Sequence, residues 1–187
     1  MSTTLQRRLF TSEEYHKMAE AGILPERGVE LLHGEIIDRS PIGSQHAAVV
    51  DRLTRLLSRH LPEDYILRVQ SPIRTDEQSE PEPDLAVLTF REDFYAGGLP
   101  TPADVELLIE VSGRSLAYDR EVKIPHYAGS GIPECWLVDL EADRIERYRQ
   151  PVSGKYREVD VFDRSATLAS ESLGIEVEVE QVLPHLA

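Results

Sequence analysis

Periodic spacing of apolar residues predicts that the central part of the chain combines helices with buried strands. Between Ser44 and His60, the residues Val50, Leu53 and Leu57 recur at helical intervals, which is typical of one apolar face of a helix. Short apolar runs bounded by polar loops are instead typical of strands. Such runs cover residues 65–69, 84–88, 107–111 and 135–138.

A second helix is predicted over residues 115–129, between the third and the fourth of these runs. Pro125 lies inside it and must kink the helix or mark a restart, because proline has no N–H for the helical hydrogen bond. From Ser44 onward the order is therefore helix, three strands, helix, strand. This order predicts a mixed α/β (α+β) fold in which helices cover a sheet.

Both ends of the chain add elements to this core. Residues 11–21 are expected to form a helix that opens with a capping box of Thr11 and Glu14, and residues 29–37 a hairpin with Gly34 at its turn. Strands are also expected around residues 144–149, 156–162 and 175–179. We expect one domain over residues 1–187, which has a core at about 44–140, an N-terminal helix and hairpin at 11–39 and C-terminal strands at 143–183.

The composition narrows the class of protein. The 187 residues include 34 acidic and 20 basic residues, and the resulting net charge of −14 argues against tight nonspecific binding to nucleic acid. The single cysteine, Cys135, excludes a disulfide framework and a cysteine-rich zinc site. No apolar run approaches the roughly 20 residues of a membrane-spanning helix, and the N-terminus lacks the apolar stretch of a signal peptide. We therefore expect a cytoplasmic protein without a membrane partner.

Two carboxylates stand at the rims of apolar runs, where an unpaired charge is costly. Asp84 opens the second run, and Glu110 lies near the end of the third. If these strands pair antiparallel, the two carboxylates meet at one edge of the sheet. With the backbone carbonyl of Val111 they would form a Mg²⁺ or Mn²⁺ site, which can activate water for attack on a phosphodiester. The structural alternative is that Asp84 caps a turn and Glu110 pairs with an arginine.

Lys123 is the third candidate, because it follows Glu110 by 13 residues and lies in the next predicted helix. A lysine there could orient water or stabilise developing charge on a phosphate. The alternative is an i, i+4 pair with Asp119 on a solvated helix face. Tyr127, one turn further, is expected to pack with its hydroxyl at the rim.

Two more residues are possible assistants of this site. His46 lies on the apolar stripe of its helix, where a satisfied core histidine is the default interpretation. Glu30 interrupts an apolar run in the hairpin, so it either points to solvent or reaches the metal edge. Several arginines could contribute a basic groove for DNA, namely Arg52, Arg55, Arg59, Arg68, Arg74 and Arg114.

Several segments occur together in an order that is typical of one known family. They are Val29–Ile37, the helix at 44–57 with His46, Pro81–Leu88, Leu108–Ser112, Tyr118 through Lys123 to Tyr127, and Gly131–Asp139. From about Phe10 to Leu183 the chain thereby resembles the Uma family of restriction endonucleases, within the PD-(D/E)XK nuclease superfamily. The resemblance implies a restriction-endonuclease-like core of order αβββαβ, which agrees with the order derived above.

By this resemblance, Asp84 and Glu110 hold Mg²⁺ and Lys123 completes the catalytic group. In the commonest form of the superfamily the lysine lies two residues after the second acid, where this chain has Ser112. The family pattern supplies the lysine from the following helix instead. Glu30 and His46 match family positions near the site and are expected to assist.

The leading hypothesis is therefore a Mg²⁺-dependent endonuclease that hydrolyses DNA phosphodiester bonds. A homodimer is expected, because duplex cleavage favours paired sites related by a two-fold axis. One alternative is a catalytically silent protein of nuclease fold that binds DNA or serves assembly or regulation, which the acidity favours. Another is a metal-dependent hydrolase of small phosphates.

Overall fold

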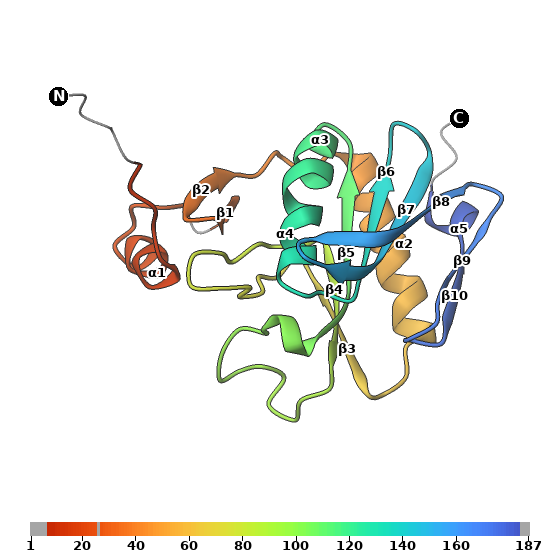
Figure 1. Ribbon diagram of the computed structural model, residues 1–187, viewed down its shortest axis with the longest axis horizontal. Helices are drawn as coiled ribbons and strands as arrows, with labels where there is room; N and C mark the ends of the chain where they lie inside the picture. Colours follow the sequence, from red (N-terminus) through yellow and green to blue (C-terminus); the bar gives the residue numbers. More distant parts are fainter. Residues whose placement is uncertain (1–6, 26, 184–187) are drawn as a thin grey trace.

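The computed structural model describes residues 7–25 and 27–183. Its centre is a six-stranded sheet in the order β3-β4-β5-β6-β7-β8, with helices on both faces (Figure 1). Neighbouring strands are antiparallel except β5 and β6, which run parallel, so the sheet is mixed as predicted. The strands are β3 (Tyr65–Val69), β4 (Leu85–Thr89), β5 (Val105–Ser112), β6 (Glu134–Asp139), β7 (Arg144–Val152) and β8 (Lys155–Asp163).

Smaller elements flank this sheet in the described part of the chain. Two antiparallel pairs form separate sheets, β1 (Val29–Leu32) with β2 (Glu35–Asp38), and β9 (Thr167–Ser170) with β10 (Ile175–Glu178). The helical segments are α1 (Ser12–Glu20), α2 (Ser44–His60), the 3₁₀ turn η1 (Pro102–Asp104), α3 (Leu116–Tyr118), the π-helical turn η2 (Asp119–Lys123), α4 (Ile124–Gly129) and α5 (Val179–Val182).

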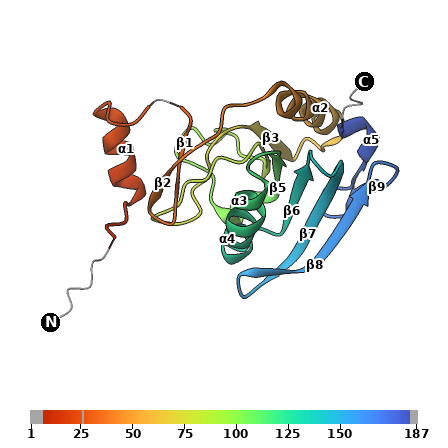
Figure 2. The ribbon, with the colours of Figure 1, turned by 90° about the horizontal axis from the view of Figure 1, so that it is seen from above.

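The two faces of the sheet pack against different helices, because successive side chains of a strand point to opposite sides. On one face, Leu85 and Ile109 pack in a buried cluster with Leu53 and other residues of α2. On the other face, Leu108 packs in a second cluster with residues of α4. Figure 2 shows the sheet between α2 on one side and α3 and α4 on the other.

The helix predicted over residues 115–129 is a continuous helical segment with a change of winding in its middle. The N–H of Ile124 donates to the carbonyl of Asp119, five residues earlier, which is the hydrogen bond of a π-helical turn. Pro125 follows directly and cannot supply the N–H of an ordinary α-helical turn. The predicted irregularity at Pro125 is therefore a π turn followed by α4.

The C-terminal part differs from the prediction in two places. A strand, β9, was not predicted; it pairs with β10. The alternation of residues 175–179 ends one residue early, because Glu178 is the last residue of β10 and Val179 begins α5. Val179 is fully buried against the α2 side of the core, so burial rather than strand pairing accounts for its apolar side chain.

The hairpin of β1 and β2 turns at His33 and Gly34, which both have positive φ angles, of 52° and 74°. A Cβ on Gly34 would lie 2.6 Å from the Cβ of Leu9, so glycine is required there. Residues 90–104 form the long connection between β4 and β5. No helix of the described residues is long and apolar enough to cross a membrane.

Candidate active site

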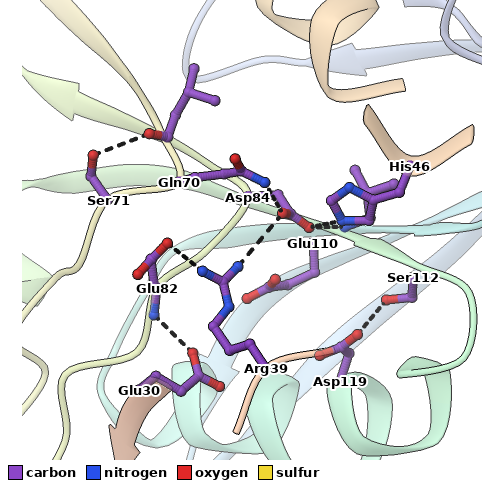
Figure 3. A network of polar contacts seen from close by, with 12 residues as sticks. Glu30, Arg39, His46, Gln70, Ser71, Glu82, Asp84, Glu110, Ser112 and Asp119 are labelled. Atoms are coloured by element: carbon purple, nitrogen blue, oxygen red, sulfur yellow. Dashed lines mark hydrogen bonds and ion pairs between the residues drawn. The ribbon is translucent and has the colours of Figure 1, made fainter. Parts of the chain in front are cut away.

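Asp84 and Glu110 lie opposite each other at one edge of the sheet. Leu85 pairs with Ile109 in the antiparallel register of β4 and β5, and continuing this register by one residue brings Asp84 opposite Glu110. Both residues are only 3% exposed. They line a cavity of about 750 Å³. The antiparallel pairing that the sequence analysis assumed is thus present, and it brings the two carboxylates together (Figure 3).

The carboxylate of Asp84 is held by donors from three different segments. Its Oδ2 accepts hydrogen bonds from Nε2 of His46 at 3.0 Å and from the N–H of Val111 at 2.9 Å. Its Oδ1 accepts one from Nε2 of Gln70 at 3.2 Å, and Nη2 of Arg39 lies 3.9 Å from the same oxygen. Burial raises the pKa of Asp84, but the hydrogen bonds outweigh burial, so the pKa lies below its ordinary value. The turn-capping alternative for Asp84 is wrong.

Glu110 is bound by two groups from the helical segment that follows β5. Nζ of Lys123 lies 2.8 Å from its Oε1, and the hydroxyl of Tyr127 donates to the same oxygen at 2.6 Å. Burial raises the pKa of Glu110, although the cation of Lys123 opposes this shift. The alternative in which Glu110 pairs with an arginine is wrong, and so is the prediction that the Tyr127 hydroxyl lies at the rim, because Tyr127 is fully buried.

Lys123 lies in the interior and not on a solvated helix face. It is 3% exposed, and its Nζ lies 3.3 Å from Glu30 as well as 2.8 Å from Glu110. Burial lowers the pKa of Lys123, but the surrounding carboxylates outweigh burial and raise it, so the lysine is charged. Asp119 is itself buried and accepts a 2.6 Å hydrogen bond from the Ser112 hydroxyl. The solvated Asp119–Lys123 pair is therefore wrong.

Glu30 and His46 both line the same cavity. Glu30 is 3% exposed and does not point to solvent; its Oε2 accepts from the N–H of Glu82 at 3.0 Å and from Lys123. His46 is half-buried. Its Nε2 contacts Asp84, whereas its buried Nδ1 has no hydrogen-bond partner within the described residues. The default interpretation of His46 as a satisfied core residue is therefore wrong, and the roles of both residues in a reaction stay predictions.

Two residues at this site were not predicted from the sequence. Gln70 follows the last residue of β3, and its N–H donates to the carbonyl of Asp84 at 2.9 Å, so the antiparallel pairing of β3 with β4 could have indicated it. Arg39 follows β2 and reaches the site from the hairpin. Nothing in the spacing of the sequence pointed to Arg39.

The donor set of the site suits a small, hard cation. Within residues 7–25 and 27–183, no group of three or more His, Cys, Asp or Glu side chains is arranged to hold a metal ion by itself. Asp84 and Glu110 supply carboxylate oxygens on a shared cavity, and Mg²⁺ is commonly held by one or two carboxylates while water and substrate phosphate complete its shell. The observed contact of Val111 is made by its N–H; the carbonyl contact stays a prediction.

Comparisons with known proteins identify the fold and the family of the chain. A crystal structure titled as that of a “putative nuclease belonging to DUF820 from Anabaena variabilis” superposes with a TM-score of 0.67 at 19% identity, over 92% of this chain and 97% of that chain. At this identity the likeness shows a shared fold. No curated protein matches the chain. A family model described as “Putative restriction endonuclease” matches residues 12–180. Because that match spans nearly all of the sequence, the chain belongs to the Uma2 family.

Proposed function

We propose that this protein is an endonuclease that hydrolyses phosphodiester bonds of DNA with Mg²⁺ or Mn²⁺ at the site of Asp84 and Glu110. The observation that carries the proposal is the meeting of these two buried carboxylates on a cavity, with the charged Lys123 on Glu110. An acid pair beside a lysine is the chemistry that phosphodiester hydrolysis needs, because negative charge develops on the phosphate during attack.

Asp84, Glu110 and the carbonyl of Val111 are the proposed ligands of the cation. When bound, the cation would polarise the phosphate and lower the pKa of a bound water. His46 and Gln70 orient Asp84 by donating hydrogen bonds to its two oxygens. This arrangement fixes the carboxylate in one direction before any ligand arrives, which reduces the cost of reorganisation.

Lys123 keeps its charge because acidic side chains surround it. Its Nζ is held between Glu30 and Glu110, so its position is set by two elements that are distant in the sequence, the hairpin and β5. From there its ammonium group can stabilise charge on the phosphate or orient the attacking water. Glu30 acts in this proposal as a positioning residue, since it contacts Lys123 and the N–H of Glu82.

The acidity of the protein also bears on the proposal. The cavity is lined by five carboxylates and three permanent cations: Glu30, Asp38, Asp84, Glu110 and Asp119 against Arg39, Arg114 and Lys123. Such an excess of negative charge repels DNA unless a cation binds first. Of the six arginines proposed from the sequence for a basic groove, Arg114 is the one that lines this cavity. A homodimer that presents two cavities to one duplex stays a prediction, which light scattering at working concentration would test.

The test is cleavage of supercoiled plasmid in Mg²⁺, in Mn²⁺ and in EDTA. Wild type is compared with Asp84→Asn and with the control Asp51→Asn, which changes an exposed aspartate of α2. We expect the wild type and Asp51→Asn to cut in either metal, and Asp84→Asn to be inactive while its circular dichroism is unchanged. Equal cutting by Asp84→Asn would mean that the site is wrong or that a contaminant cuts.

The size of the cavity supports a second candidate, a hydrolase of small phosphates. About 750 Å³ lies within the usual range of small-molecule sites. Metal-dependent hydrolysis of bis(p-nitrophenyl) phosphate by a wild type that leaves plasmid intact would favour this candidate. Metal-independent DNA binding without any hydrolysis would instead favour a catalytically silent protein of nuclease fold.

A further inference from the structure

Arg39 extends into the cavity from a fixed point of the backbone. It is the residue after β2, and its N–H donates to the carbonyl of Gly28 at 2.7 Å, across the hairpin. Its side chain is 21% exposed and lines the cavity together with Asp84 and Glu110. Figure 3 shows its guanidinium pointing toward Asp84 from the side of Glu82.

Most of the hydrogen-bonding capacity of Arg39 is unused in the part of the chain that the structure describes. A guanidinium has five N–H donors. One of them, on Nη1, donates to Glu82, and Nη2 forms only a longer ion pair, at 3.9 Å, with Asp84. A largely buried arginine whose remaining donors face a cavity is suited to a ligand that carries several acceptor oxygens.

The negative charge of the surrounding carboxylates holds the Arg39 side chain in the cavity. Burial lowers the pKa of Arg39, but the carboxylates of Glu82, Glu30 and Asp84 outweigh burial and raise it. Arg39 therefore stands as a permanent cation on the Asp84 side of the acid pair, whereas Lys123 stands on the Glu110 side. A planar guanidinium presents paired N–H groups that match two oxygens of one phosphate, which an ammonium group cannot do.

Arg114 provides a second cation at the same cavity. It lies in the loop after β5, is exposed, and lines the cavity without a hydrogen bond or ion pair to any other described residue. Arg39 and Arg114 come from separate segments, the hairpin and the loop that follows Glu110. Two arginines with unused donors on one cavity can contact two phosphates of a single strand.

We propose that Arg39 binds the phosphate on which the site acts, through its unused N–H groups, and that Arg114 binds a neighbouring phosphate at the mouth of the cavity. The proposal rests on the function proposed above and names the residues that recognise its substrate. The competing explanation is that Arg39 only neutralises Glu82 and Asp84 and never touches the substrate.

The experiment measures binding, so that it does not depend on turnover. Fluorescence anisotropy follows a labelled 20-base-pair duplex with Ca²⁺ in place of Mg²⁺, over a series of salt concentrations. The variants are Arg39→Gln, Arg39→Lys and Arg114→Gln. The matched control is Arg157→Gln, an exposed arginine of β8 that does not line the cavity.

We expect Arg39→Gln to weaken binding by about ten- to one-hundred-fold, as is usual for a lost hydrogen bond to a charged group. Loss of one phosphate contact should also reduce the slope of log affinity against log salt concentration by about 0.9. Arg39→Lys should keep that slope, since it keeps the charge, but recover only part of the affinity. Arg114→Gln should reduce the slope, and Arg157→Gln should change neither quantity.

Equal affinity and slope for Arg39→Gln and Arg157→Gln would overturn the inference, as would a wild type that does not bind the duplex. If circular dichroism shows that Arg39→Gln does not fold, the test uses Arg39→Lys instead. Unchanged affinity of Arg39→Lys for the duplex would then overturn the inference. The outcomes distinguish the two proposals. A wild type that binds through Arg39 but never cuts contradicts the endonuclease function alone. If Arg39→Gln cuts DNA as fast as the wild type, only the phosphate site is contradicted.

Discussion

The hydroxyl of Tyr127 donates a hydrogen bond of 2.6 Å to Oε1 of Glu110, and both side chains are buried. Lys123 contacts the same oxygen at 2.8 Å. Both of these donors therefore converge on one oxygen of the carboxylate, and no other residue in the described part of the chain forms a hydrogen bond or ion pair with the second oxygen, Oε2. Tyr127 thus fixes the direction in which Glu110 presents its second oxygen.

Replacement of Tyr127 by phenylalanine tests this relationship. The change removes one donor from a buried carboxylate, so we expect the free energy of unfolding to fall by about 1–3 kcal/mol in urea denaturation. It should also slow plasmid cleavage about tenfold, since Glu110 is held less firmly. The control is Tyr156→Phe, which removes a partly buried hydroxyl that donates to the carbonyl of Ile132. If both variants cut plasmid at the same rate, Tyr127 serves stability alone.

Replacement of Lys123 by methionine should be more severe. Glu30 and Glu110 would lose the cation between them, and breaking a buried ion pair from one side costs about 3–5 kcal/mol. We expect a loss of that order in urea denaturation and no detectable cleavage. Adding Glu30→Gln to Lys123→Met should restore part of the stability and none of the activity. A single variant as stable as wild type would show that the pair contributes nothing to folding.

The pair of His33 and His126 is expected to make the free energy of unfolding depend on pH. Nδ1 of His126 lies 2.9 Å from Nε2 of His33, and its Nε2 lies 2.7 Å from the Thr75 hydroxyl. Since that hydroxyl donates to the carbonyl of Ser79, it accepts from Nε2–H of His126, and Nδ1 accepts from His33. Burial, together with His33, lowers the pKa of His126 from 6.5 to about 4, so His126 is neutral in the folded protein.

Between these two pKa values the unfolded chain binds the proton and the folded chain does not, so stability falls as the pH falls below 6.5. Linkage gives a loss from His126 of about 2 kcal/mol between neutral pH and pH 5. Urea denaturation at both pH values should show this loss in the wild type, and a correspondingly smaller loss in His126→Gln. The same loss in both proteins would assign the effect to other groups.

Pro125 is expected to matter for activity more than for stability. It lacks the N–H that an α-helical turn would direct to Glu121, and the π turn of η2 precedes it. With alanine at this position the segment can wind as an α-helix, which rotates Lys123 relative to Tyr127. We expect Pro125→Ala to change stability by less than about 1 kcal/mol and to slow cleavage at least tenfold. Pro102→Ala, in η1, is the control; unchanged cleavage in Pro125→Ala would mean that the π turn persists without proline.

The sequence predicted the main elements and the meeting of the two acids. The short apolar patterns predicted the two strands but not their direction; antiparallel pairing of β4 with β5 was assumed, and it is sufficient to bring Asp84 opposite Glu110. Helical spacing alone left two environments open for Lys123, this site or a surface pair with Asp119, and the burial that decides between them could not be predicted. The π turn changes which residues share a face, and no local pattern reveals a π turn beyond the proline itself.

Arg39 was missed for a different physical reason. It contacts Glu82 and Asp84, more than 40 residues further along the chain, and this contact depends on how the hairpin packs beside the sheet. Periodicity describes which face of an element is buried, but it carries no information on the placement of one element against another. The alternation of apolar and polar residues at 175–179 led to a strand prediction that is one residue too long, for a related reason. Val179 is apolar because it contacts the core, and it is not part of a strand.

The long connection between β4 and β5 leaves the end of the sheet away from the site open to change. Asp84 precedes the first residue of β4, and Glu110 lies near the last residue of β5, so residues 90–104 join these strands at their other ends. Five strand residues separate the two ends by about 16 Å. Additional residues could therefore be inserted in this connection without altering the distance between the two acids. Such an insertion could be a module that recognises a particular DNA sequence. Target choice and bond cleavage would then be free to evolve, or to be engineered, as separate properties.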